Sequence, residues 1–119
     1  MGRKFTVPYG LYKAQGFVNP FLAKQTGFTD ADLEVLFQSL ENAFQFDQSA
    51  ARPAGSMNPR KLIVFKHNNE LGQAPSHKLF ETVSVQKKET VEIPRSFQDY
   101  DVAINRRALP DGIEIIERV

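Results

Sequence analysis

The sequence feature that most restricts the fold is an amphipathic stretch of helical period over residues 30–47. Its apolar positions recur every three or four residues, with polar residues opposite, and they are Leu33, Leu36, Phe37, Leu40, Ala43 and Phe44. Thr29 is a favourable N-cap, and Asp30 and Asp32 fall in the first turn, where the helix dipole favours anions. The pattern predicts one long helix that ends before Pro53 and whose aromatic stripe belongs to a hydrophobic core.

The other apolar segments have the patterns of strands. Residues 4–12 alternate between two faces, although Pro8 favours an edge position or a bulge. Residues 62–65 form a continuous apolar run, as in a central strand buried on both faces. Further strand patterns cover residues 79–86, 90–93, 100–105 and 113–117. The last two flank a Pro-Asp-Gly turn, which predicts an antiparallel hairpin.

Together these patterns predict an α+β domain in which one main helix packs on a mainly antiparallel sheet. Gly16 and Asn19-Pro20 interrupt the periodicity and predict an irregular connection before the helix. The 119 residues are enough for a single domain, 1–119, with its own core. Cysteine is absent, which excludes disulfides, thiolate zinc sites and cysteine nucleophiles. No apolar run approaches the ~20 residues of a membrane span, so we expect a cytoplasmic protein without a membrane partner.

Charge is unevenly distributed along the chain. The net charge of +1 conceals blocks of +4 over residues 1–28, −5 over 29–51, +5 over 52–88 and −3 over 89–119. Such segregation favours opposed basic and acidic surfaces, one for a polyanion and one for a basic partner. A fold that mixes the blocks is equally consistent with the pattern.

Residues suited to catalysis are scarce. The two histidines, His67 and His77, have no partners at zinc-site spacing, and no Walker loop or nucleophile elbow is present. Asp99 and Asp101 would share one face of a strand and could bind a cation, although a solvated face explains them more simply. We therefore expect no enzyme activity, no catalytic or metal-binding residues and no cofactor.

Nucleic-acid binding has better support. Arg3-Lys4 precede a strand that carries Tyr9 and Tyr12, and the pairs Lys66-His67 and His77-Lys78 lie at strand ends across one loop. Cations beside exposed rings suit a single-stranded nucleic acid, because charges hold phosphates and rings stack on bases. From the residues alone, RNA or DNA binding and a protein-interaction module are equally supported.

A series of ordered motifs then points to one family. They are Gly2-Arg3-Lys4-x-x-Val7-Pro8-Tyr9-Gly10-Leu11-Tyr12, Gly16-Phe17-Val18-x-Pro20-Phe21, Lys24-Gln25-Thr26-Gly27-Phe28, Asp47-x-Ser49-Ala50-Ala51-Arg52, Phe65-Lys66-His67, Leu71-Gly72-x-Ala74-Pro75-x-His77-Lys78-Leu79-Phe80 and Pro94-Arg95-Ser96-Phe97-x-Asp99-Tyr100. In this order they resemble the backbone subunit of the type I-C CRISPR surveillance complex, within the repeat-associated RNA-binding superfamily.

The resemblance implies a ferredoxin-like, RNA-recognition-type core and a non-catalytic role. Copies of such a subunit polymerise along a CRISPR RNA, together with other CRISPR-associated subunits, and hold the guide so that it pairs with target DNA. The positions that match the family and suit contact with the guide backbone are Arg3, Lys4, Arg52, Lys66, His67, His77 and Lys78. Tyr12 is a further RNA-binding candidate, whereas Tyr9 and Leu11 are expected in the core.

The resemblance covers only the C-terminal portion of the family, whose subunits are more than twice as long. We therefore expect a partial core that exposes sheet edges and apolar area, and that self-associates. The alternative function is a protein-only assembly fragment without appreciable RNA binding. A metal-dependent nuclease is a distant third, which incubation of RNA with magnesium would reveal.

Overall fold

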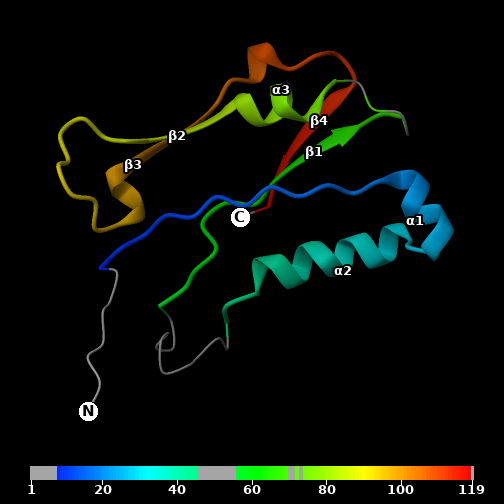
Figure 1. Cartoon of the computed structure of the whole chain (residues 1–119), viewed down its shortest axis with the longest axis horizontal. Helices are drawn as coiled ribbons and strands as arrows, with labels where there is room; N and C mark the ends of the chain where they lie inside the picture. Colours follow the sequence, from blue (N-terminus) through cyan, green and yellow to red (C-terminus); the bar gives the residue numbers. More distant parts are fainter. Residues whose placement is uncertain (1–7, 46–55, 70–71, 73, 119) are drawn as a thin grey trace. The chain divides into compact units, whose positions relative to one another are not determined.

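The computed structural model describes residues 8–45, 56–69, 72 and 74–118 (Figure 1). The chain divides into two compact units, which are described separately. One unit contains residues 8–16 and 74–109, and the other contains residues 17–72 and 110–118 as far as they are described. Helices and antiparallel strands occur in both, which confirms the α+β prediction. The assignment of 1–119 to one domain stays a prediction.

A two-stranded antiparallel sheet organises the unit of residues 17–72 and 110–118. Strand β1 (Ile63–His67) pairs with β4 (Ile113–Glu117), with Phe65 opposite Ile115, and the two arrows lie side by side in Figure 1. The strand predicted at residues 62–65 is therefore confirmed. The prediction that this strand is central and buried on both faces is wrong. In the described part of the chain β1 pairs with a single strand, and residues 63–65 are only half-buried.

Helix α1 (Pro20–Thr26) occupies a segment that the sequence pattern assigns to an irregular connection. The Asn19 side chain accepts hydrogen bonds from the backbone N–H groups of Phe21 (2.9 Å) and Leu22 (3.3 Å). Pro20 fills the first helical position, where a missing N–H costs nothing. Gly27, at φ 76°, ends the helix in the left-handed conformation that glycine adopts most easily. The Asn-Pro pair thus starts a helix rather than interrupting structure.

Helix α2 (Asp30–Glu41) begins where the sequence predicts, at a capping box between Thr29 and Asp32. It ends at residue 41 instead of 47, with Asn42 as its C-cap: the side-chain amide of Asn42 donates to the Gln38 carbonyl (2.9 Å) alongside the backbone N–H (3.1 Å). The apolar stripe of α2 is only partly covered. Leu36 and Leu40 are 40% and 45% exposed, so their prediction as core residues is wrong.

The unit of residues 8–16 and 74–109 holds the most deeply buried residues that the structure describes. Helix α3 (Ser76–Glu81) leads into β2 (Val83–Lys87), so only the second half of the strand predicted at residues 79–86 is extended. Leu79 is 2% exposed and Thr82 is 5% exposed. The Thr82 hydroxyl donates to the Leu79 carbonyl at 2.6 Å, which satisfies the buried polar group and fixes the junction.

Strand β2 pairs antiparallel with β3 (Tyr100–Ile104), and Val85 lies opposite Val102. The hairpin predicted between residues 100–105 and 113–117 is therefore wrong, although both strands exist. The 3-10 turn of Arg106–Ala108 follows β3, and the Asn105 N–H donates to the Thr82 carbonyl at 2.7 Å. Each strand pairs with an earlier strand instead, β3 with β2 and β4 with β1, so the local turn signal does not set the pairing. Residues 90–93 form turns and bends instead of the weak strand expected there.

Residues 8–12 do not form the predicted strand, and residues 4–7 lie outside the described part of the chain. Pro8 cannot donate a ladder hydrogen bond and Gly10 weakens an extended segment. The half-buried Tyr9 ring instead packs against Tyr100, with ring centroids 6.2 Å apart and a tilt of 35°.

Among the described helices, none has the length and apolar character needed to cross a bilayer.

Candidate nucleic-acid interface

Two open hollows contain several of the side chains proposed to bind RNA. The first, here called the β1 hollow, has a volume of about 520 Å³ and is lined by Lys66, His67, Asn68, Gly112, Ile113 and Glu114. The Asn68 N–H donates to the Gly112 carbonyl at 3.1 Å, just beyond the paired ends of β1 and β4. Gly112 sits at φ 85°, a left-handed conformation that glycine tolerates. Strand pairing therefore places Lys66 beside Glu114 and His67 beside Ile113 at one end of the sheet.

Charges in the β1 hollow are mixed. Lys66 lies directly opposite Glu114 across the β1–β4 pair, so a base from the basic central block faces an acid from the C-terminal block. At this place folding mixes the charge blocks rather than separating them. Gly72, at φ 87°, lies close to His67: a Cβ added there would be 3.4 Å from the imidazole Nδ1. The glycine thus permits close approach of the loop backbone to the ring.

The second hollow, here called the α3 hollow, has a volume of about 330 Å³ and is lined by Lys13, Gln15, His77, Phe80, Glu81 and Val83. Its apolar members, Phe80 and Val83, are half-buried, whereas the four polar side chains are exposed. An apolar floor therefore meets a polar rim that carries one base, one acid, an amide and an imidazole. Lys78 is exposed on the same helix, one residue after His77.

The described candidates are divided between the two units. His77 lines the α3 hollow, Lys66 and His67 line the β1 hollow, and the two hollows belong to different units. The Tyr12 ring is 75% exposed and lies over Gly10, whose added Cβ would be 3.0 Å from the tyrosine oxygen. Arg3, Lys4 and Arg52 lie outside the described residues.

Sequence reasoning missed Lys13, Gln15 and Phe80. Lys13 and Gln15 are two residues apart, the spacing that places side chains on one side of an extended chain. That spacing is a signal that the sequence itself contains. The sequence pattern assigns Phe80 to a strand, and its position on the hollow floor depends on α3 and on the packing around Leu79.

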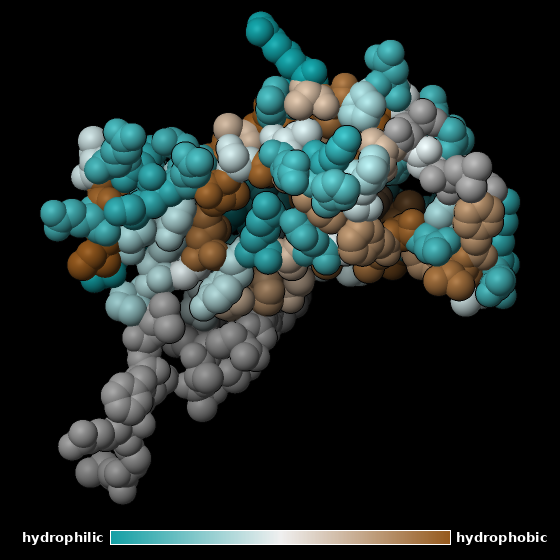
Figure 2. All heavy atoms as spheres, turned by 45° about the horizontal axis from the view of Figure 1, so that its top comes forward, coloured by the Kyte–Doolittle hydropathy of each residue, from teal (hydrophilic) through white to brown (hydrophobic). Residues whose placement is uncertain are grey.

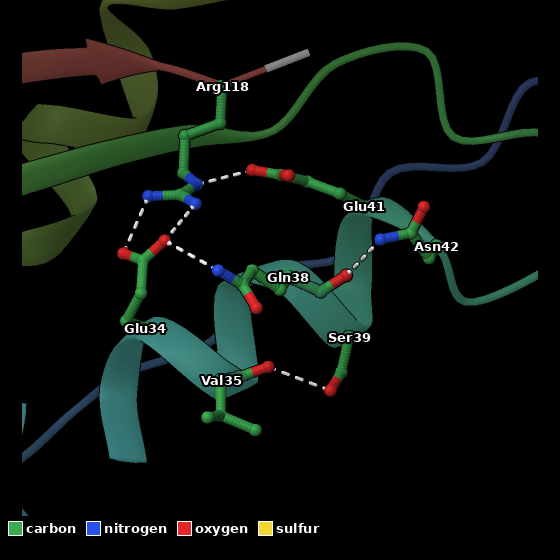
Figure 3. A network of polar contacts seen from close by, with 7 residues as sticks. All are labelled: Glu34, Val35, Gln38, Ser39, Glu41, Asn42 and Arg118. Carbon is green, nitrogen blue, oxygen red and sulfur yellow. Dashed lines mark hydrogen bonds and ion pairs between the residues drawn. The ribbon is translucent and has the colours of Figure 1, made fainter. Parts of the chain in front are cut away.

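An electrostatic clamp joins α2 to the residue that follows β4. Arg118 donates to both carboxylate oxygens of Glu34, at 2.7 and 3.0 Å, and its Nε donates to Glu41 (Figure 3). Its guanidinium also lies 5.1 Å from the centre of the Phe37 ring. The hydrogen bonds that Arg118 donates lower the pKa of Glu34, and the acceptance of these bonds by the Glu34 and Glu41 carboxylates raises the pKa of Arg118. With its donors directed at carboxylates, Arg118 serves to hold α2 rather than to bind phosphate.

Asp99 and Asp101 do not share a strand face, contrary to the prediction. Asp99 ends the 3-10 turn of Phe97–Asp99, and its carboxylate accepts from the N–H groups of Arg95 (2.7 Å) and Ser96 (3.1 Å). The hydrogen bond from the Arg95 N–H is the main cause of its lowered pKa. Asp101 lies in β3 with an exposed side chain. Within the described ranges, no three histidine, aspartate or glutamate side chains come together as metal ligands.

Apolar exposure is concentrated in one segment. Of the eleven large hydrophobic side chains exposed among the described residues, eight lie between residues 17 and 40. This α1–α2 apolar surface comprises Phe17, Val18, Phe21, Leu22, Phe28, Val35, Leu36 and Leu40. Figure 2 shows hydrophobic side chains at the surface at the right-hand end of the view, the end at which α1 lies in Figure 1. Such a concentration of exposed apolar side chains is typical of an interaction surface.

Comparison with known proteins gives one family. The model of the family described as CRISPR-associated protein Cas7 matches residues 1–105 of the chain. A search of curated proteins gives no match.

Proposed function

The chain belongs to the CRISPR-associated protein Cas7 family, and from this premise we propose that it is a non-catalytic, RNA-binding scaffold subunit of a type I-C surveillance complex. The family match is the observation that carries the proposal, since subunits of this family assemble with CRISPR RNA and other CRISPR-associated subunits. The sequence motifs further support type I-C, a C-terminal portion of a longer subunit and a ferredoxin-like core. In the proposed role, cytoplasmic copies line the guide so that its bases pair with target DNA.

Two basic places on the described surface are consistent with this role. Lys66 and His67 end β1, while His77 and Lys78 lie in the first turn of α3, and each pair includes at least one exposed side chain. Each lysine that meets a phosphate releases condensed counterions from the RNA, so binding that depends on such contacts weakens as salt rises. Neither hollow is purely basic, so this chain on its own should bind RNA with low affinity.

The experiment is a titration of a fluorescein-labelled single-stranded RNA, followed by fluorescence anisotropy at several salt concentrations. We expect weak binding that weakens with salt. Lys66→Ala or Lys78→Ala should reduce the salt slope by about 1 for each phosphate that the variant no longer binds. Arg3→Ala tests the basic N-terminal pair in the same way. Lys61→Ala, an exposed lysine outside both hollows, is the matched control, and absence of binding at low salt would overturn the proposal.

The α1–α2 apolar surface favours a second candidate, a protein-only assembly fragment. The two functions differ in one measurable respect, because only the scaffold retains nucleic acid. At low salt, where weak phosphate contacts persist, we expect the scaffold to carry the ultraviolet absorbance of bound bases through gel filtration with added RNA, whereas an assembly fragment would not. Incubation of RNA with magnesium tests the non-catalytic part of the proposal, and cleavage by the purified protein would contradict it.

A further inference from the structure

We propose that the α1–α2 apolar surface docks an amphipathic helix of a partner protein, and that the polar side of this partner helix is basic. The inference rests on the assembly part of the proposed function and not on RNA binding. The exposed apolar side chains of this surface lie on two consecutive helices and on the residues beside them. A basic amphipathic helix matches both the apolar side chains and the charge of this segment.

The apolar stripe of α2 is wider than the part that its own unit covers. Leu33 and Phe37 are half-buried, and the Arg118 guanidinium lies over the Phe37 ring. Leu36 and Leu40 are four residues apart, so they lie one turn apart on the same side of the helix, and both are exposed. The 12 residues of α2 extend over about 18 Å. The open part of the stripe is therefore a ridge along which a second helix of similar length can pack.

Helix α1 supplies a second set of apolar side chains. Phe21 and Leu22 are 47% and 56% exposed, and Phe17, which precedes the helix, is 73% exposed. None of the seven residues of α1 is buried. Asn19 caps one end of the helix and Gly27 closes the other, so its backbone is ordered before a partner arrives. Binding to a surface that is already ordered costs less conformational entropy.

Charge on the same segment selects the kind of partner. α2 carries four acids, and residues 25–45 include no lysine, arginine or histidine. Glu34 and Glu41 share the single positive charge of Arg118, so negative charge remains in excess (Figure 3). A partner helix with lysine or arginine beside its apolar side is attracted to this surface, whereas an acidic helix is repelled.

A second copy of this chain matches the surface less well. In a symmetric contact the acids of one α2 would face those of the other, and like charges placed together across an interface cost affinity. Self-association through this surface is therefore expected to be weak, and a basic helix should compete with it.

The test is a fluorescence anisotropy titration of the full chain against two labelled model peptides of about 14 residues, close to the length of α2. Both peptides place leucine on one side of a helix, and the remaining positions are lysine in one peptide and glutamate in the other. The lysine peptide should bind at least about ten-fold more tightly than the glutamate peptide at low salt. The difference should shrink as salt rises, because salt screens exposed charges.

Two variants locate the binding surface. Leu22→Asn and Leu36→Asn remove apolar contacts without adding charge, and each should weaken binding of the lysine peptide at least about five-fold. Ile93→Asn is the matched control, because Ile93 is 63% exposed and lies outside this surface, and it should change the affinity far less. Far-UV circular dichroism of each variant separates a failure to bind from a failure to fold.

Equal binding of the two peptides at low salt would overturn the proposal, as would unchanged binding by both leucine variants. If the lysine peptide does not bind, while Leu22→Asn removes self-association, a second copy is the occupant instead and the proposal is wrong. Absence of RNA binding would contradict the scaffold function and leave the peptide result intact, so the two failures are distinguishable.

Discussion

At the scale of single residues, Arg118 is a cation that stabilises the fold, although the protein is proposed to bind a polyanion. Its fork-shaped guanidinium meets one carboxylate with two parallel hydrogen bonds and a second carboxylate with Nε. Glu34 and Glu41 lie seven residues apart, two turns along the same side of α2. One side chain thus secures two turns of the helix to the end of β4. Lysine, a point charge, could not reproduce this geometry.

Arg118→Ala is therefore expected to lower the thermal midpoint and to flatten its dependence on pH. The folded pKa of Glu34 is held below its ordinary value of 4.5, so the clamp contributes stability above that pH and loses it as the pH falls through the lowered value. Thermal unfolding followed between about pH 6 and pH 3 measures this. Arg95→Ala is the control, since the Arg95 guanidinium donates to the carbonyl of its neighbour Pro94. Parallel curves for wild type and Arg118→Ala would contradict the role of the clamp.

At the scale of elements, the ends of helices follow local side-chain chemistry closely. α1 begins at Asn19 and α2 at Thr29, and each cap residue accepts hydrogen bonds from N–H groups that the helix leaves without partners. The apolar stripe of α2 is only partly covered, so packing contributes less to it than to a well-buried helix. Its capping box therefore carries a larger share of its stability than in a well-packed helix.

Thr29→Ala should reduce the free energy of unfolding by about 1 kcal/mol and reduce the helical signal in far-UV circular dichroism. The variant loses the bond from the Asp32 N–H to the threonine hydroxyl (3.2 Å) and the hydroxyl's own bond to the Asp32 carboxylate (3.1 Å). Ser39→Ala is the matched control, because the Ser39 hydroxyl donates to the Val35 carbonyl inside the helix, where such bonds add little. Equal effects of the two substitutions in urea titrations would argue against the capping box.

At the scale of the whole molecule, the contrast is between few buried side chains and many exposed apolar ones. Among the described residues, Leu79 is the one buried hydrophobic side chain, while the α1–α2 apolar surface is exposed. The two separate two-stranded sheets also leave strand edges without partner strands in the described part of the chain. These features support the proposal that the chain works as part of a larger assembly, where apolar surface and edges meet neighbours.

Self-association should follow from the α1–α2 apolar surface. We expect sedimentation equilibrium to show concentration-dependent association, and Leu22→Lys to weaken it by placing a charge in the apolar contact. Leu22 is 56% exposed; Ile93, 63% exposed and outside this surface, provides the control Ile93→Lys. A sharp monomer at high loading, or equal effects of the two substitutions, would contradict this role for the surface.

The sequence by itself determined the features that depend on neighbouring residues. The start of α2, the existence of β1, β3 and β4, the mixed α+β class and the family resemblance are all readable from periodicity, capping and motifs. The candidate site was readable in part, since His77, Lys66 and His67 do line hollows.

Only the tertiary structure decided which strands pair and which side chains meet. β3 joins β2, the strand before it, and β4 joins the distant β1, so the local turn signal between β3 and β4 does not set the pairing. Lys13 shares the α3 hollow with His77, far along the chain, and Arg118 reaches Glu34 across 84 positions of sequence. Contacts of this kind depend on the packing of distant segments, which a periodicity of about two or 3.6 residues does not encode.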